Sequence, residues 1–292
     1  MTPKEHHRNT VLWLGAHKTG TTFLQSMLDL SQTSLKESGY EYLNLDEFRK
    51  KYTRPILYGG NHGSPHSPSG VNFIFDENIP NLVQHVLSRD GLYPNLADRS
   101  TKLASYFGFV KPHVFFGIRD YATFLPSLFC ETLKSTSYKP FSEFYDPSIN
   151  QLDWNDVIDR LRGAFPESEI SIYAYESLRG NECTLLERVT GIPSGSFRLP
   201  KGKSRLGFSH EAVKSLHQLS KSRTVTFEDV FEAVRTFPKG KKWSSFNPFN
   251  ADRVGELNTL YNEHLQCISS RADINFIDLR SEAAPRQSSE NQ

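Results

Sequence analysis

Short apolar runs alternate with amphipathic stretches over the first two thirds of the chain. The runs, such as the one from Val11 to Leu14, predict buried strands of a parallel sheet. The stretches between them repeat apolar residues every three to four positions, which predicts helices. We expect strands at residues 11–14, 71–75, 114–118 and 170–175, and helices at 21–30, 79–87, 97–107, 121–134, 153–165, 182–189, 211–219, 227–237 and 251–268.

This alternation predicts an α/β fold with a central parallel sheet flanked by helices on both faces. After residue 191 the patterns are helical, so the C-terminal part should be mostly helical. Residues 52–70 are rich in glycine, proline, histidine and serine, and they predict a long loop. We expect a single domain over residues 1–280 and a disordered polar tail over residues 281–292.

Composition narrows the classes of function. The 34 basic and 33 acidic residues leave a net charge of +1, which argues against a general nucleic-acid binder. The three cysteines lie far apart, in a spacing that suits neither a metal motif nor a disulfide framework. No apolar run has the length of a secretory signal or of a membrane span. We therefore predict a cytoplasmic protein without a membrane-spanning segment.

A glycine-bounded loop follows the first predicted strand. Between Gly15 and the predicted helix, backbone N–H groups and the helix dipole favour a phosphate, and Thr21 and Thr22 could add hydroxyl donors. The spacing of Gly15 and Gly20 matches the P-loop pattern of nucleotide-binding proteins. However, Thr21 stands where a P-loop kinase has lysine, and the loop's lysine is Lys18.

The stretch His-Lys-Thr-Gly-Thr-Thr at residues 17–22 resembles the 5′-phosphosulfate-binding loop of PAPS-dependent sulfotransferases, where PAPS is 3′-phosphoadenosine 5′-phosphosulfate. The resemblance implies a P-loop-like sulfotransferase fold and PAPS as the sulfuryl donor. It also implies that the Lys18 ammonium stabilises the negative charge of the leaving group. The loop residues that it assigns to the donor are Gly15, His17, Lys18, Thr19, Gly20, Thr21 and Thr22.

A second motif resembles the 3′-phosphate site of the same family. The strand at residues 114–118 leads into Arg119 and Asp120, and Ser127 follows eight residues after the arginine, as in that family. The family often has proline after this Arg-Asp pair, whereas this chain has Tyr121. Residues 175–178 also resemble a stretch of bacterial sulfotransferases that is mainly structural.

A later basic segment could cover the 3′-phosphate. Lys203 lies in one such segment, residues 201–205, and residues 239–242 form another. Either segment could equally be a solvated surface, since most runs of charged residues are. Arg119, Ser127 and Lys203 complete the predicted donor site.

Transfer to a hydroxyl also needs a base. We predict Glu77, because residues 75–78 resemble a Ser-x-Glu-Asn stretch of bacterial members and follow a predicted strand. Glu77 could instead be an acidic residue that favours a helix N-terminus. His17 and His62 are further candidates. Because Lys18, Arg119 and backbone N–H groups can neutralise the donor's charge, the resemblance requires no metal.

Three functions remain open at this point. We favour a sulfotransferase that moves the sulfuryl group of PAPS to the hydroxyl of a saccharide or another small molecule. The alternatives are a P-loop-type nucleotide kinase and a non-catalytic nucleotide-binding module. The sequence leaves the acceptor and the oligomeric state undetermined.

Overall fold

The protein is described by a computed structural model that covers residues 10–59, 62–68, 70–149, 152–201 and 207–280. Lys203 and the predicted tail lie outside these residues. Five strands form one sheet in the order β2-β1-β5-β6-β7, and all four neighbouring pairs are parallel. The strands are β1 (Val11–Trp13), β2 (Phe73–Phe75), β5 (His113–Ile118), β6 (Ile170–Ala174) and β7 (Asn275–Ile277).

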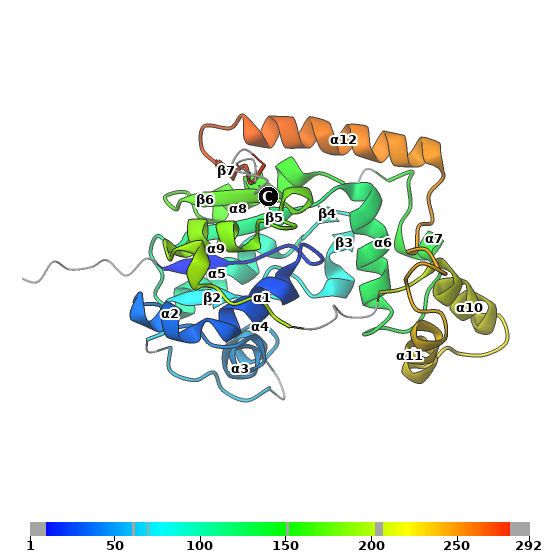
Figure 1. Cartoon of the computed structure of the whole chain (residues 1–292), viewed down its shortest axis with the longest axis horizontal. Coiled ribbons are helices and arrows are strands. Elements are labelled where there is room, and N and C mark those ends of the chain that lie inside the picture. Colours follow the sequence, from blue (N-terminus) through cyan, green and yellow to red (C-terminus); the bar gives the residue numbers. More distant parts are fainter. Residues whose placement is uncertain (1–9, 60–61, 69, 150–151, 202–206, 281–292) are drawn as a thin grey trace, which may run out of the picture.

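The sheet separates two apolar layers, as expected for a parallel sheet that is buried on both faces. Successive side chains of a strand point to opposite faces, so Leu12 lies in one layer while Val11 and Trp13 lie in the other. Figure 1 shows α12 on one side of the sheet and α1 and α2 on the other. The Leu12 layer contains α5 (Leu96–Tyr106), α6 (Tyr121–Thr132), α8 (Trp154–Ala164) and α12 (Ala251–Ser269), and the opposite layer contains α1 (Thr21–Leu30), α2 (Gln32–Glu37) and α9 (Glu182–Thr190). This arrangement confirms the predicted α/β class with a central parallel sheet flanked by helices.

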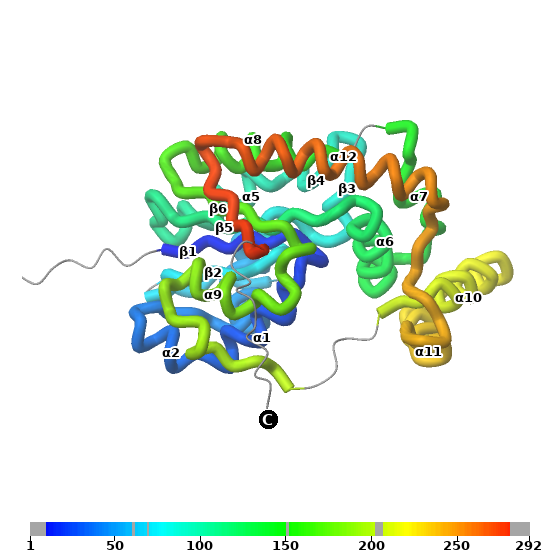
Figure 2. Tube along the Cα trace, turned by 45° about the horizontal axis from the view of Figure 1, so that its top comes forward, coloured from blue at the N-terminus to red at the C-terminus, as the bar shows by residue number. Residues whose placement is uncertain are grey.

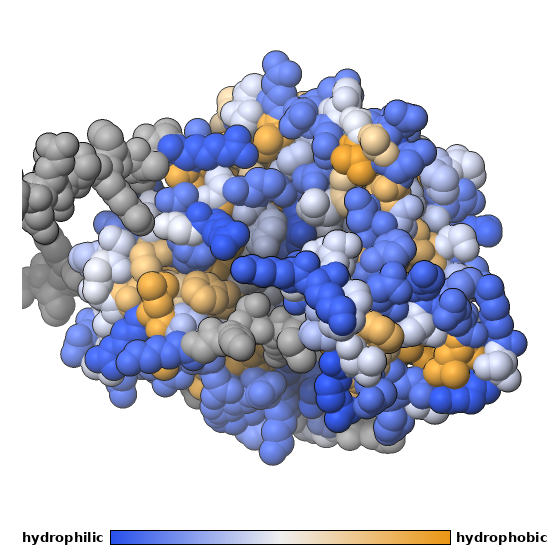
Figure 3. Space-filling model, turned by 45° about the vertical axis from the view of Figure 1, so that its right-hand side comes forward, coloured by the Kyte–Doolittle hydropathy of each residue, from blue (hydrophilic) through white to orange (hydrophobic). Residues whose placement is uncertain are grey.

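The C-terminal part contains the three predicted helices, joined by long irregular segments. Helices α10 (His210–Ser220) and α11 (Phe227–Thr236) pack against each other and against the end of α6, where Phe129 and Leu133 join their apolar cluster. Figure 2 shows this helical pair beside α6, away from the sheet. Figure 3 shows a largely hydrophilic face on this side of the molecule, with apolar side chains only in small patches.

Two predicted segments differ in the structure. Residues 79–87 form no α-helix but turns, a 3₁₀ helix (η3, Val83–His85) and the start of β3 (Leu87–Ser88), which pairs with β4 (Gly91–Leu92). Asn81 explains this, because its amide group donates to His85 O and accepts from the Asn95 N–H, and such bonds compete with a helix.

The predicted loop at residues 52–70 is also shorter than expected. A continuous helical segment formed by α3 (Leu45–Phe48), the π-helical turn η1 (Arg49–Thr53) and α4 (Arg54–Leu57) runs through its first residues. Pro55 lies directly after the π-helical turn η1, and its missing N–H removes one donor from this continuous segment.

Candidate functional site

The predicted site residues meet at one edge of the sheet. Because β1, β2 and β5 are parallel, their carboxyl ends lie at the same edge, with β1 between the other two. The chain continues from β1 to β2 on one side and then crosses to β5 on the other, which makes β1 a topological switch point. Ligands of open α/β sheets bind in the crevice at such a point. The loop after β1, Glu77 after β2 and Arg119 after β5 all lie there.

The loop after β1 turns through three residues with left-handed backbone. Gly15, Lys18 and Gly20 have φ values of 45°, 66° and 82°. Glycine is required at Gly15, because an added Cβ would lie 2.9 Å from Cγ2 of Thr21 and 3.2 Å from the ring of Phe75. Lys18 is a non-glycine residue in this region, a conformation that often marks functional sites.

The N-terminus of α1 points amide groups out of this loop. The helix begins at Thr21, and Gly20 at its N-cap supplies no side-chain hydrogen bond. Within the described part of the chain, the amides of Gly20, Thr21 and Thr22 have no acceptor. Such donors, together with the helix dipole, favour an anion.

The three loop threonines differ in exposure. The Thr19 hydroxyl donates to Ala16 O at 2.6 Å and is buried, so it stabilises the loop itself. The Thr21 side chain is buried as well, whereas Thr22 is exposed. Of the two hydroxyl groups predicted as donors, those of Thr21 and Thr22, only that of Thr22 therefore lies at the surface.

Arg119 connects the loop to β5. Its Nη1 donates to the carbonyl oxygen of Lys18 at 2.7 Å, and its Nε donates to Thr123 Oγ1 at 3.0 Å. The guanidinium group also lies over the Tyr175 ring, 4.5 Å from the centroid. Burial lowers the pKa of Arg119, yet an arginine remains charged at neutral pH. Its Nη2 donates to no described residue, so one arm of the guanidinium fork is open to a further acceptor.

One face of α6 lies beside the loop that follows β1 and begins next to Arg119. Thr123, Ser127 and Glu131 follow at spacings of four residues and therefore share this face. Thr123 contacts Arg119, and Glu131 Oε2 lies 2.9 Å from Lys18 Nζ. Ser127 is half-buried between these two contacts, on the side of α6 that the loop faces.

Two acidic residues near this face have structural roles. The Asp120 carboxylate caps α6 by accepting the Ala122 N–H at 3.0 Å. The Asp120 N–H donates to Glu176 Oε1 at 2.9 Å, and Glu176 Oε2 accepts from Tyr261 at 2.7 Å. Glu176 therefore ties β5, η4 (Tyr175–Ser177) and α12 together, in agreement with the structural interpretation of residues 175–178.

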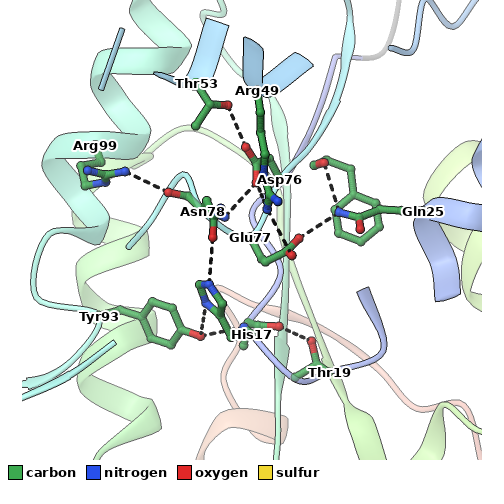
Figure 4. Close-up of polar contacts among 12 residues, drawn as sticks. His17, Thr19, Gln25, Arg49, Thr53, Asp76, Glu77, Asn78, Tyr93 and Arg99 are labelled. Atoms are coloured by element: carbon green, nitrogen blue, oxygen red, sulfur yellow. Dashed lines mark hydrogen bonds and ion pairs between the residues drawn. The ribbon is translucent and has the colours of Figure 1, made fainter. Parts of the chain in front are cut away.

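Glu77 lies beside the loop, where its Cβ would contact a side chain at Gly15. Its Oε2 accepts from Gln25 Nε2 at 2.9 Å, and its Oε1 is 3.2 Å from Arg49 Nη2 (Figure 4). Burial alone would raise the pKa of Glu77, but the charge of Arg49 and the hydrogen bond from Gln25 outweigh it and hold this pKa below its usual range. The carboxylate is therefore ionised at neutral pH.

Arg49 is the central cation of this network. It donates to Asp76 Oδ1 at 2.7 Å, and Asp76 also accepts from Thr53 at 2.7 Å (Figure 4). Sequence reasoning missed Arg49 and Gln25, because they come from separate helical segments and no motif links them to Glu77. Asp76, fully buried after β2, was the one local signal that a cation must lie nearby.

His17 fixes the loop through its backbone and its ring. Its backbone N–H donates to the Tyr93 hydroxyl at 2.8 Å, and its ring Nε2 is 3.1 Å from Asn78 Oδ1 (Figure 4). Tyr93 Oη lies 3.4 Å from the other ring nitrogen. Burial lowers the pKa of His17, so the ring is neutral, and both of its nitrogens have partners. A neutral imidazole has a single acceptor nitrogen, whereas each Glu77 oxygen, although also engaged, keeps a second lone pair, which favours Glu77 over His17 as a base. His62 is exposed after α4.

Several lysines gather near the end of α6. Burial raises the pKa of the Cys130 thiol to about 12, against the opposing charges of Lys18, Lys134 and Lys239. Of these lysines, Lys18 and Lys134 both lie 2.9 Å from Glu131 Oε2 in the last turn of α6. Lys239 belongs to the second basic segment considered for the 3′-phosphate, whereas Lys203 of the first lies outside the described residues.

Comparison with known proteins assigns no function, so the function must be argued from the site itself. No protein-family model matches the chain, and no curated protein matches it.

Among the described residues, no three histidine, cysteine, aspartate or glutamate side chains cluster as metal ligands would. In the same part of the chain, no helix combines the length and the apolar character needed to cross a membrane.

Proposed function

We propose that this protein is a PAPS-dependent sulfotransferase, which moves the sulfuryl group of PAPS to the hydroxyl of a saccharide or another small molecule. The observation that carries the proposal is the junction at Lys18. There the phosphate-type loop after β1 meets Arg119 after β5 through a hydrogen bond of 2.7 Å. The two motifs that resemble the 5′- and 3′-phosphate sites of sulfotransferases, about 100 residues apart in sequence, thus form one continuous site.

The residues of this site fit a doubly phosphorylated donor. The free amides at the start of α1, together with Lys18 and the exposed Thr22, suit a 5′-phosphosulfate. The open Nη2 of Arg119 suits a 3′-phosphate, and Ser127 lies on the adjoining face of α6.

Each charged residue has a role in the proposed transfer. A bond forms between the acceptor oxygen and sulfur while the bond from sulfur to the 5′-phosphate oxygen breaks. The Lys18 ammonium would stabilise the negative charge that develops on that leaving oxygen. Glu77, ionised and held by Gln25 and Arg49, would accept the proton of the acceptor hydroxyl. The products are the sulfated acceptor and 3′-phosphoadenosine 5′-phosphate.

The same geometry disfavours a nucleotide kinase. Thr21, at the position of the kinase lysine, is buried beside Gly15 and carries no charge. Asp120, the acidic residue after β5, is engaged as the cap of α6 and follows a cation that points at the loop. A kinase needs a lysine on the β- and γ-phosphates and a carboxylate for magnesium, and these two positions supply neither.

Calorimetric binding tests the proposal directly. The protein should bind 3′-phosphoadenosine 5′-phosphate without magnesium, and at least tenfold more tightly than ADP, because only the former offers a 3′-phosphate to Arg119. ATP with magnesium is the matched kinase ligand. Tighter binding of magnesium-ATP than of the 3′-phosphorylated nucleotide would overturn the proposal in favour of a kinase.

A further inference from the structure

Lys18 is held at both of its ends by residues of the α6 region. Arg119, just before α6, donates to its backbone carbonyl at 2.7 Å. Glu131, in the last turn of the helix, accepts from its ammonium group at 2.9 Å. The lysine that the proposed mechanism places on the leaving group therefore already has a carboxylate partner in the structure.

Glu131 divides its charge between two lysines. Lys134 Nζ and Lys18 Nζ both lie 2.9 Å from the same oxygen, Oε2, and the three side chains are 24–30% exposed. Two ammonium groups on one oxygen repel each other, so each weakens the other's attraction to Glu131. Burial would raise the pKa of Glu131, but the charges of Lys18 and Lys134 lower it to about 2, so it is an anion at any pH at which the protein works.

We infer that Glu131 is a positioning residue that competes with the sulfuryl donor for the ammonium of Lys18, and that Lys134 sets how strongly it competes. This inference rests on the proposed function. A phosphosulfate anion bound at the start of α1 attracts the same ammonium that Glu131 holds. When Lys18 turns to that anion, Lys134 stays as the counter-ion of Glu131, which keeps a half-buried carboxylate from losing every partner.

The inference predicts opposite effects for two uncharged variants. Glu131→Gln should tighten binding of 3′-phosphoadenosine 5′-phosphate about two- to fivefold, the range expected for releasing a partly exposed ion pair. Lys134→Gln should weaken it by a similar factor, because Glu131 then holds Lys18 alone. The double variant Glu131→Gln/Lys134→Gln should bind like Glu131→Gln, since Lys134 acts through Glu131.

A general field effect of the removed charge is distinguished by a third position. In a Lys18→Gln background, a field effect of Glu131→Gln on an anion would persist, whereas competition for Lys18 would vanish. Glu167→Gln is the matched control, because Glu167 pairs with Lys111 in another exposed ion pair and should leave binding unchanged.

Calorimetric titration with 3′-phosphoadenosine 5′-phosphate decides between the outcomes. Tighter binding by Glu131→Gln that disappears without Lys18 supports the inference. Unchanged or weaker binding by Glu131→Gln, with a wild-type protein that binds, overturns the inference and leaves the proposed function intact. A wild-type protein that binds no 3′-phosphorylated nucleotide overturns both.

Discussion

Replacing Arg119 by alanine removes its contacts with Thr123 and Tyr175 and two contacts that bear on nucleotide binding. One is the hydrogen bond from Nη1 to Lys18 O at 2.7 Å, which shapes the loop. The other is the bond that Nη2 would give to a 3′-phosphate. A charge-assisted bond to phosphate contributes about 1.5–3 kcal/mol, and the bond to the carbonyl about 1 kcal/mol. Since about 1.4 kcal/mol corresponds to tenfold in affinity, the two losses can be separated by comparing ligands.

Isothermal titration of the Arg119→Ala variant should therefore show unequal losses. Binding of 3′-phosphoadenosine 5′-phosphate should weaken about 60- to 700-fold, because both contacts are lost. Binding of adenosine 5′-phosphate, which has no 3′-phosphate, should weaken only about fivefold through the loosened loop. Arg119→Lys is the matched control, because it keeps the charge but loses the planar fork. Its affinity for 3′-phosphoadenosine 5′-phosphate should lie between those of the wild type and of Arg119→Ala.

The comparison between ligands also defines the refuting result. Equal losses for the two nucleotides would mean that Arg119 only supports the loop at Lys18, and that the 3′-phosphate is bound elsewhere or not at all. A loss confined to the 3′-phosphorylated nucleotide, with no change for adenosine 5′-phosphate, would instead show that the bond to Lys18 O contributes little to the shape of the loop.

Further variants test the chemistry and the loop. Lys18→Ala should lower turnover about 10²- to 10³-fold while changing nucleotide affinity less than tenfold, and wild-type turnover in a sulfate-transfer assay would reject its role on the leaving group. Glu77→Gln should lower turnover about 10²-fold or more with nucleotide binding intact. Because the base must be deprotonated and the pKa of Glu77 lies below its usual range, wild-type turnover should fall on the acid side only below the ordinary pKa range of a glutamate; a limb near neutrality would point to a histidine base. Gly15→Ala should destabilise the fold by about 1–3 kcal/mol in urea unfolding, because the added Cβ meets Thr21 at 2.9 Å in a left-handed backbone. Gly163→Ala in α8, with nothing near its added Cβ, should be neutral or stabilising, and equal costs for the two would contradict the packing argument.

Local patterns predicted most of the sheet and its helices. Parallel strands are apolar on both faces, so β1, β2, β5 and β6 stand out as continuous runs in the sequence. The last strand, β7, was not predicted because Asn275 begins it in an exposed position and Phe276 is only half-buried, so it does not form a continuous apolar run. Residues 79–87 were predicted wrongly as a helix, because their apolar spacing says nothing of the bonds that Asn81 makes to His85 and Asn95.

The sequence by itself determined where the glycine-bounded loop after β1 would form. Strand, glycines and helix are contiguous there, and their backbone preferences are properties of neighbouring residues. The tertiary structure decided which side chains serve that loop. Arg49 reaches Glu77, and Glu131 reaches Lys18 across 113 residues, only because helices pack on the sheet in one particular arrangement. Ion pairs of this kind depend on distances between elements, and residues far apart in the chain carry no local signal of their partner.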